Sequence, residues 1–347
     1  MSDTQAAGIA LTRKGLADIA DTMNARPGTL VVFTAGASPE HAARIEKMGG
    51  RLIVDHGTMV RRTQAKDGNA TSPARIEAAM GVDRVRAIRN HIKAVVAVDD
   101  STGLACGWLG SPNLNRITRP EQTERLSSED AAALLALADR VFESMPAGVI
   151  STTLAQSYAG LHRALGSAKA SGARVHVGAD IPLRFVRTPG VVFVDQAGMG
   201  DAVLAAARHV GRGAAIRGVT WSMDVDLAST FARRIKAGAV SSMRLGLPAR
   251  FGRRKPEAAQ AVADAGVSID WTPAHAKLAV IRGPGGVVTL SGGCNFTNGG
   301  QLDAIVVRHG EDAAAEAESV MDALPSEAAP DGVEVRAQAD FFSLLAA

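Results

Sequence analysis

Two stretches of the chain share one alternation of apolar and polar positions. Residues 28–57 and 218–248 each begin with an apolar run of strand length, continue with apolar positions at helical spacing, and end with a second apolar run. Glycine follows each helical pattern, at Gly49 and Gly238, as is common at the end of a helix. The pattern predicts a strand, a helix and a second strand in both stretches.

These stretches open a longer internal repeat. In each copy, basic residues come next, then a helix pattern with proline near its start and glycine after its end, and then a His-x-Lys segment. We therefore predict two copies of one α/β unit, over residues 1–146 and 198–347. Segment 147–197 carries one helix pattern and two short strand patterns, and is either a linker or a set of strands added to one sheet.

Composition fits this organisation. The chain has 347 residues, enough for two domains that each bury a core, and 46% of them are apolar. The alternation of strands and helices predicts a sheet covered by helices in each half. No apolar run is long enough to span a bilayer, and the first residues lack the features of a secretory signal, so we expect no membrane anchor.

Charge and cysteine content narrow the function only slightly. The net charge of +3 permits a polyanionic partner without requiring one, and an aromatic content of 4% argues against a base-stacking platform. Cys106 and Cys294 are the only cysteines, which favours a reducing cytoplasm. No cluster of cysteine and histidine has zinc-binding spacing.

A hairpin is predicted directly after each His-x-Lys segment. Lys93 and Lys277 begin apolar runs of strand character, a turn follows, and a second strand returns to a Gly-rich loop. The turn at 283–286 reads GPGG, which favours a hairpin turn over a phosphate-binding loop. Because a hairpin brings its outer ends together, we expect the His, Lys, Ser and Asn of one copy to converge.

The spacing around these segments is the same in both copies. The Gly-rich loops end in Asn113 and Asn295, 22 and 20 residues after the histidine, and an acidic residue follows eight positions later. A buried core would keep valine and leucine at such positions, not a lysine beside a histidine. The repeated residues therefore indicate a functional site: His91, Lys93 and Asn113, and His275, Lys277 and Asn295.

The motifs HIK…GSPN and HAK…GGCN resemble the two half-motifs of the phospholipase D superfamily, and the resemblance covers both halves of the chain. It implies a duplicated αβα sandwich whose halves are related by a pseudo-twofold axis, with one active site between them. A monomer is then sufficient for a complete site. The resemblance also implies a nucleophilic histidine from one half, a general-acid histidine from the other, and neither metal nor other cofactor.

The chemistry of phosphodiester cleavage agrees with this set of residues. Two histidines can supply a nucleophile and a leaving-group acid, and lysines and asparagines can cover the charge of the phosphoryl oxygens. In the superfamily an acidic residue after the asparagine supports a histidine, which fits Glu121 and Asp303. We expect an acid-labile phosphohistidine as the intermediate.

Two departures from the superfamily pattern affect the assignment of roles. The aspartate that follows the lysine by five positions is replaced by Val98 and Arg282, although Asp99 is adjacent to the first. The serine of the loop is present as Ser111 but replaced by Gly293 in the second copy. The first copy is therefore closer to the superfamily pattern, and on that ground we assign His91 as the nucleophile and His275 as the acid. We expect the Ser111 hydroxyl to lie beside His91 and to steady the phosphorylated residue by a hydrogen bond to a phosphoryl oxygen or to the supporting acid.

The substrate is not given by the motif alone. Basic residues at matching places in both copies, and others near the motifs, suit a nucleic-acid phosphate backbone. They are Arg61, Arg62, Arg89, Arg116, Arg253, Arg254 and Lys255. We interpret the chain as a nuclease acting on DNA or RNA. The alternatives are an enzyme that cleaves or transfers phospholipid groups and an inactive nucleic-acid-binding module of the same fold.

Overall fold

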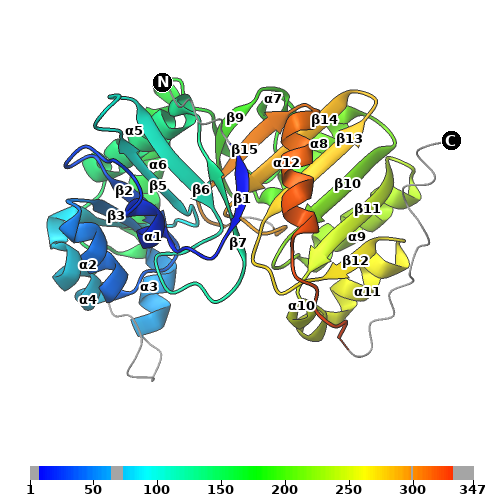
Figure 1. The fold of residues 1–347 in the computed structure, drawn as a ribbon, viewed down its shortest axis with the longest axis horizontal. Helices are drawn as coiled ribbons and strands as arrows, with labels where there is room; N and C mark the ends of the chain where they lie inside the picture. The colour runs from blue at the N-terminus through cyan, green and yellow to red at the C-terminus, as the bar shows by residue number, and fades with distance from the viewer. Residues whose placement is uncertain (1–7, 64–72, 298–299, 331–347) are drawn as a thin grey trace.

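The computed structural model describes residues 8–63, 73–297 and 300–330 of the chain. The chain forms two lobes, each built on one sheet with helices against it (Figure 1). Within the part of the chain that the structure describes, no helix combines the length and the apolarity that a membrane span requires.

The first sheet has seven strands in the order β1-β7-β6-β5-β2-β3-β4. Strands β2, β3 and β4 run parallel, and the other neighbouring pairs are antiparallel. The strands are β1 (Ile9–Thr12), β2 (Val31–Thr34), β3 (Arg51–Asp55), β4 (Val85–Ile88), β5 (Ala94–Val98), β6 (Ala105–Gly110) and β7 (Glu121–Arg125).

The second sheet has eight strands in the order β12-β11-β10-β13-β14-β15-β9-β8. Its hairpin between β13 and β14 closes over the predicted GPGG turn. The strands are β8 (Val175–Val177), β9 (Gly190–Asp195), β10 (Ala214–Val219), β11 (Val240–Leu247), β12 (Ser268–Trp271), β13 (Leu278–Gly283), β14 (Gly286–Gly292) and β15 (Asp303–His309).

Side-chain hydroxyl groups cap the starts of α2, α5 and α6. The hydroxyl of Ser127 accepts from the N–H of Asp130 at the start of α5, for example. The helices are α1 (Leu16–Ala20), α2 (Pro39–Lys47), α3 (His56–Thr63), α4 (Pro73–Met80), α5 (Ser128–Ser144), α6 (Leu154–Ala170), α7 (Arg184–Arg187), α8 (Met199–Val210), α9 (Val225–Lys236), α10 (Ala249–Arg254), α11 (Pro256–Asp264) and α12 (Glu311–Asp322). A 3₁₀ turn covers Val82–Arg84.

The two sheets repeat one strand order, which confirms the predicted duplicated α/β sandwich. The order β1-β7-β6-β5-β2-β3-β4 of the first sheet is matched by β9-β15-β14-β13-β10-β11-β12 of the second. Strand β8 is added beyond β9, so both short strands predicted within 147–197 belong to the second sheet. Among the described residues, only α6, β8, α7 and the 3₁₀ turn lack a counterpart in the repeat.

The two lobes exchange contacts through the first strand of each copy. Ile9 of β1 packs with Ala314 and Ala317 of α12, and Figure 1 shows β1 beside that helix. Phe193 of β9 shares a core with Leu134 on α5. Each lobe therefore packs the first strand of its copy against the last helix of the other copy.

Candidate active site

The two His-x-Lys segments lie immediately before strands β5 and β13, each of which begins one residue after the lysine. The N–H of His91 donates to the carbonyl of Leu302 over 2.7 Å, and the N–H of His275 donates to the carbonyl of Pro120 over 2.9 Å. Leu302 and Pro120 directly precede the acidic residues of the repeat. The main chain therefore joins the histidine of each half to the acidic strand of the other half.

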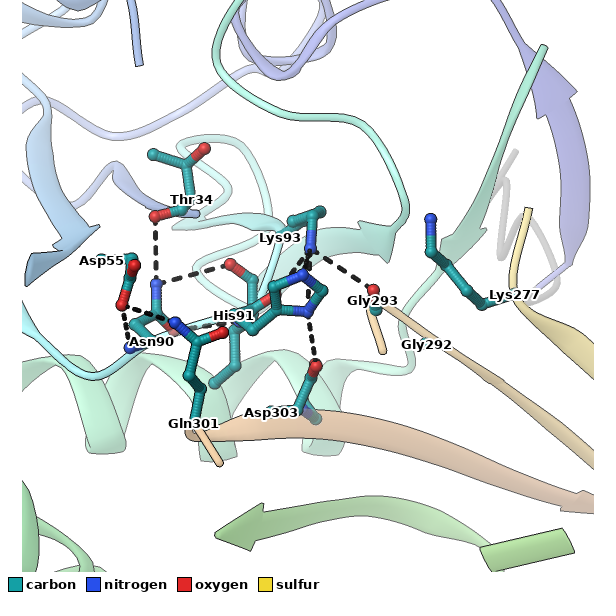
Figure 2. Close-up of polar contacts among 12 residues, drawn as sticks. Thr34, Asp55, Asn90, His91, Lys93, Lys277, Gly292, Gly293, Gln301 and Asp303 are labelled. Carbon is teal, nitrogen blue, oxygen red and sulfur yellow. Dashed lines mark hydrogen bonds and ion pairs between the residues drawn. The ribbon is translucent and has the colours of Figure 1, made fainter. Parts of the chain in front are cut away.

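The side chains also join each histidine to the acidic residue of the other half. Nδ1 of His91 lies 2.8 Å from Oδ2 of Asp303, as Figure 2 shows, and Nδ1 of His275 lies 2.9 Å from Oε2 of Glu121. The carboxylate side chains are 3% and 8% exposed, whereas the imidazoles are 26% and 20% exposed. Because a carboxylate can only accept, Nδ1–H donates to it and Nε2 is left for chemistry.

A buried lysine accompanies each histidine. Nζ of Lys93 lies 3.1 Å from both ring nitrogens of His91 and donates to the carbonyls of His91 and Gly293 over 2.9 and 3.3 Å. Nζ of Lys277 lies 2.8 Å from Nδ1 of His275 and donates to the carbonyl of that residue. Burial lowers the pKa of both lysines. A phosphoryl anion beside them would favour their charged forms again.

The same surroundings favour the neutral form of both histidines. Burial first, and then the charge of the neighbouring lysine, lowers the pKa of His91 and lowers that of His275 to about 4, although the carboxylates oppose the shift. The charge of Lys277 also acts on His91, and that of Lys93 on His275. The motif residues of both halves therefore form one electrostatically coupled cluster.

The Ser111 hydroxyl bonds a supporting acid, one of its two expected roles, but that acid serves His275 and not His91. The hydroxyl is hydrogen-bonded to the carboxylate of Glu121 and accepts from the N–H of Gln122 over 3.0 Å. Pairing of β6 with β7 brings the serine to Glu121, and Glu121 crosses to His275. Ser111 therefore supports the histidine of the second half.

Gly293 replaces the loop serine in the second copy because the backbone packs closely there. A Cβ at this position would lie 3.0 Å from the carbonyl oxygen of His91 and 3.1 Å from Oδ1 of Asp303. The next residue, Cys294, is hydrogen-bonded to Asp303, and burial raises the pKa of its thiol well above the usual value. The thiol is therefore neutral and packs behind the His91 pair.

The two motif asparagines lie on loops anchored by a matching pair of threonines. Oγ1 of Thr34 accepts from the N–H of Leu114 over 3.1 Å, and the second copy repeats this contact between Thr220 and Phe296. Oδ1 of Asn113 is 3.4 Å from the Thr34 hydroxyl. Oδ1 of Asn295 is buried and has no hydrogen-bond partner among the described residues, so protein groups leave this amide incompletely satisfied.

A polar network holds the residue before His91 (Figure 2). Oδ1 of Asp55 accepts from the N–H of Asn90 over 3.2 Å and from Nε2 of Gln301 over 2.9 Å, and Nδ2 of Asn90 donates to the carbonyl of Thr34 over 3.2 Å. Asp55 and Asn90 have no exposed surface. In the second copy an alanine, Ala274, precedes the histidine, so this network belongs to the His91 side alone.

Sequence reasoning missed Trp221, Arg250 and Gln122 around His275. The ring of Trp221 meets the imidazole edge-on, with centroids 5.1 Å apart, and two arginines, Arg119 and Arg250, lie over the indole. Gln122 donates to the carbonyls of Lys277 and Gly292 over 3.2 and 2.8 Å. The available signal was a tryptophan directly after the predicted strand that ends at Thr220, where the first copy has alanine.

The predicted basic residues have different surroundings. Arg89 donates to the carbonyl of Gly300 over 3.0 Å and lies 5.6 Å from the ring of Tyr158. Lys255 donates to the carbonyl of Met223 and pairs with the carboxylate of Asp224. Among the predicted basic residues whose side chains the structure describes, the exposed ones are Arg116, Arg253 and Arg254. The side chains of Arg61 and Arg62 lie outside the described part of the structure.

Comparison with known proteins gives likeness in fold. No family model matches the chain, and no curated protein matches its sequence. Phosphatidylserine synthase from Haemophilus influenzae Rd KW20 matches with a TM-score of 0.57 at 9% identity, over 94% of this chain and 89% of that one. A mutant of yeast tyrosyl-DNA phosphodiesterase matches with a TM-score of 0.50 at 10% identity, over 88% and 89%.

Polyphosphate kinase from Porphyromonas gingivalis matches with a TM-score of 0.51 at 9% identity, over 92% of this chain. The match covers 50% of that kinase, so this chain spans half of its length. At such identities the likeness concerns the fold. The chain shares the fold of these proteins, and its own two sheets form the duplicated α/β fold that the two His-x-Lys motifs predict.

Proposed function

We propose that the protein is a phosphodiesterase that hydrolyses nucleic acid, DNA or RNA, through a phosphohistidine intermediate and without a cofactor. One observation carries the proposal. Each half supplies a histidine whose Nδ1 is held by a buried carboxylate of the other half, with a buried lysine beside the ring. This arrangement provides two oriented imidazoles and two cations for one phosphoryl group.

The reaction has two balanced steps. Nε2 of His91 attacks phosphorus and the bond from phosphorus to the leaving oxygen breaks. The protonated form of His275, whose Nδ1–H stays with Glu121, gives its Nε2 proton to that oxygen. Water then attacks phosphorus while His275 takes its proton, and the bond from phosphorus to His91 breaks. Lys93 and Lys277 balance the charge of the phosphoryl oxygens in both steps.

The polar network before His91 supports the assignment of this residue as the nucleophile. Attack on phosphorus demands a closely defined position, and the buried side chains of Asp55 and Asn90 fix the backbone there. The imidazole of His91 is also slightly more exposed than that of His275, which lies against Trp221. Ser111 no longer contributes to this assignment, because it serves the His275 pair.

Exposed arginines support nucleic acid as the substrate. Arg116 follows the first motif asparagine, and Arg253 and Arg254 end α10. None of the three forms an ion pair with a carboxylate among the described residues. Unpaired guanidinium groups at the surface are the usual contacts to a phosphate backbone.

A phospholipid is the second candidate substrate. Ile150, Leu154 and Tyr158 are exposed by 63%, 48% and 37%, and the ring of Tyr158 lies beside Arg89, two residues from His91. An exposed apolar ridge next to the nucleophile suits an acyl chain or a membrane surface. The proposal and this alternative differ in which phosphodiester the same chemistry cleaves.

The decisive experiment compares both substrates in EDTA. We expect wild-type protein to cleave plasmid DNA or RNA with chelator present, and His91→Ala to lose this cleavage. The described residues contain no group of three or more His, Cys, Asp or Glu placed to hold a metal ion, and two lysines supply the positive charge. Release of headgroup from phosphatidylglycerol vesicles without nucleic-acid cleavage would favour the lipid candidate. Binding of DNA without any turnover would identify an inactive binding module.

A further inference from the structure

Two arginines from different halves lie on one tryptophan beside His275. The guanidinium carbon of Arg119 is 4.3 Å from the centre of the Trp221 ring, and that of Arg250 is 4.7 Å from it. Arg119 comes from the segment before β7, and Arg250 comes from α10. Contact with the indole restricts both side chains, so their planar groups are positioned before any ligand arrives.

The tryptophan is itself fixed by the motif scaffold. It follows Thr220, whose hydroxyl accepts from the N–H of Phe296 in the loop that carries Asn295. Its ring meets His275 at an angle of 71° with centroids 5.1 Å apart. The position of the two guanidinium groups is therefore tied to the histidine that we assign as the general acid.

The surrounding charge is uncompensated. Arg253 and Arg254 act electrostatically on Arg250, and burial together with these neighbours and Arg119 lowers its pKa. In the described ranges 8–63, 73–297 and 300–330, none of these four arginines pairs with a carboxylate. Like charges held together without a counter-charge are stabilised by an anion that binds among them.

Resting on the proposed phosphodiesterase function, we propose that Arg119 and Arg250 bind the phosphate that neighbours the scissile one on the leaving-group side. The substrate is then a strand with at least two consecutive phosphodiesters, and a compound with one phosphodiester occupies only the reaction centre. Trp221 acts as a positioning residue for the two guanidinium groups. The site selects for chain length, because the flanking phosphate adds binding energy that a single diester lacks.

The test compares thymidine oligonucleotides of two and four residues in EDTA. Dissociation constants come from fluorescence anisotropy over a salt series, and kcat/KM comes from product analysis. In Arg119→Ala/Arg250→Ala we expect the preference of the wild type for the tetramer over the dimer to fall about tenfold. The slope of log K against log salt for the tetramer should fall by about 1.4, because each of the two arginines accounts for about 0.7 on a single strand.

A matched control removes the same charge elsewhere. Arg184 also lies on an aromatic ring, 4.9 Å from Phe185, and it shares α7 with Arg187. Helix α7 comes directly before the start of β9, whereas Asp303 pairs with Val194 near the other end of that strand. The two control arginines therefore belong to the end of β9 that is farther from Asp303. Arg184→Ala/Arg187→Ala should keep the wild-type slope and the wild-type preference for the tetramer.

A second variant guards against misfolding. Arg119→Lys/Arg250→Lys keeps both charges but loses planar stacking, so it should keep most of the salt slope and bind the tetramer severalfold more weakly. Turnover by the wild type decides the proposed function, whereas the binding series decides the role of the two arginines even without turnover. A wild-type slope in the alanine variant, or wild-type affinity in a folded lysine variant, would overturn the inference.

Discussion

The two halves build the same cluster of motif residues and surround it differently. On the side of His91, buried amides and a carboxylate fix the backbone, and a neutral thiol packs behind the acidic partner. On the side of His275, a hydroxyl supports the acidic partner, and a tryptophan carries two arginines. The shared part is a histidine, a lysine and an acid received from the other half.

This difference agrees with different chemical roles for the two histidines. A residue that attacks phosphorus benefits from a rigid support, which the Asp55 network supplies. A residue that protonates a leaving group lies where the rest of the substrate departs, and cationic groups are useful there. In the proposed mechanism, the residues common to both copies are those that both steps need, and the residues that differ are those that one step needs.

The largest expected effect separates the two histidines. His91→Ala and His275→Ala should each lower the turnover of an oligonucleotide by about 10⁴-fold. With bis(4-nitrophenyl) phosphate, whose leaving group needs no proton, His275→Ala should still form an acid-labile adduct on His91. Mass spectrometry at alkaline pH locates the phosphate.

The same experiment can reverse the assignment. Phosphate found on His275 in the His91→Ala protein, with His91 never labelled in the wild type, would exchange the two roles. The fold and the reaction class would stay as described. The rigid surroundings of His91 would then need a different explanation.

A smaller effect tests the crossing of the acidic partners. Asp303→Asn should lower activity by about 10³-fold, because Nδ1 of His91 loses the acceptor that fixes its tautomer. The carboxylate raises the pKa of His91, so its removal should lower that pKa further. Histidine NMR spectra should show His91 changing while His275 keeps its own partner.

Glu121→Gln is the matched variant for the other side. It should alter the spectrum of His275 and leave that of His91 close to the wild type. If each substitution instead perturbed the histidine of its own half, the crossed arrangement would be incorrect. Thermal unfolding of both variants checks that they are folded.

A pH profile gives a further, more moderate effect. The pKa of His275 is lowered to about 4, so between pH 8 and 6 the acid is mostly unprotonated and its protonated fraction rises tenfold per unit of falling pH. The pKa of His91 is lowered as well, chiefly by burial, which favours the neutral form that attack on phosphorus requires. We expect kcat/KM for an oligonucleotide to rise about tenfold per unit as pH falls from 8 to 6. A maximum above pH 8 would contradict this assignment.

The smallest expected effect concerns the exposed arginines at the end of α10. Arg253→Ala/Arg254→Ala should reduce the salt slope of duplex DNA binding by about one unit for each phosphate that an arginine no longer neutralises. Arg212→Ala removes an exposed charge that is held by the carbonyl of Ala237 and serves as the control. An unchanged slope in the double variant would show that these arginines face solvent only.

The sequence predicts the features that both copies share. Apolar periodicity gives the strands and helices, and repetition of the His-x-Lys segments and the loop asparagines gives the duplicated fold. The short strands between the repeats are visible in the apolar pattern, but spacing does not decide whether they form a linker or join a sheet. Strand pairing over a long sequence distance decides this, since β9 pairs with β15.

The spacing of residues along the chain does not reveal contacts that cross between the two copies. It also does not reveal residues that only one copy has. Glu121 and Asp303 follow their asparagines by the same number of residues, so the sequence gives no sign of which histidine each one serves. The partner depends on how the two sheets meet. Trp221 has no counterpart in the first copy, and a search for repeated residues passes over it for this reason.

The crossed partners also set when a growing chain can become active. Synthesis runs from the N-terminus, so His91 and Lys93 emerge long before residue 303 has been translated. Until then His91 has no carboxylate to orient it, and His275 has not yet received the first half's Glu121 within a folded interface. A nascent fragment that stops before residue 303 therefore lacks the carboxylate partner of His91, and the proposed chemistry needs both halves of the repeat.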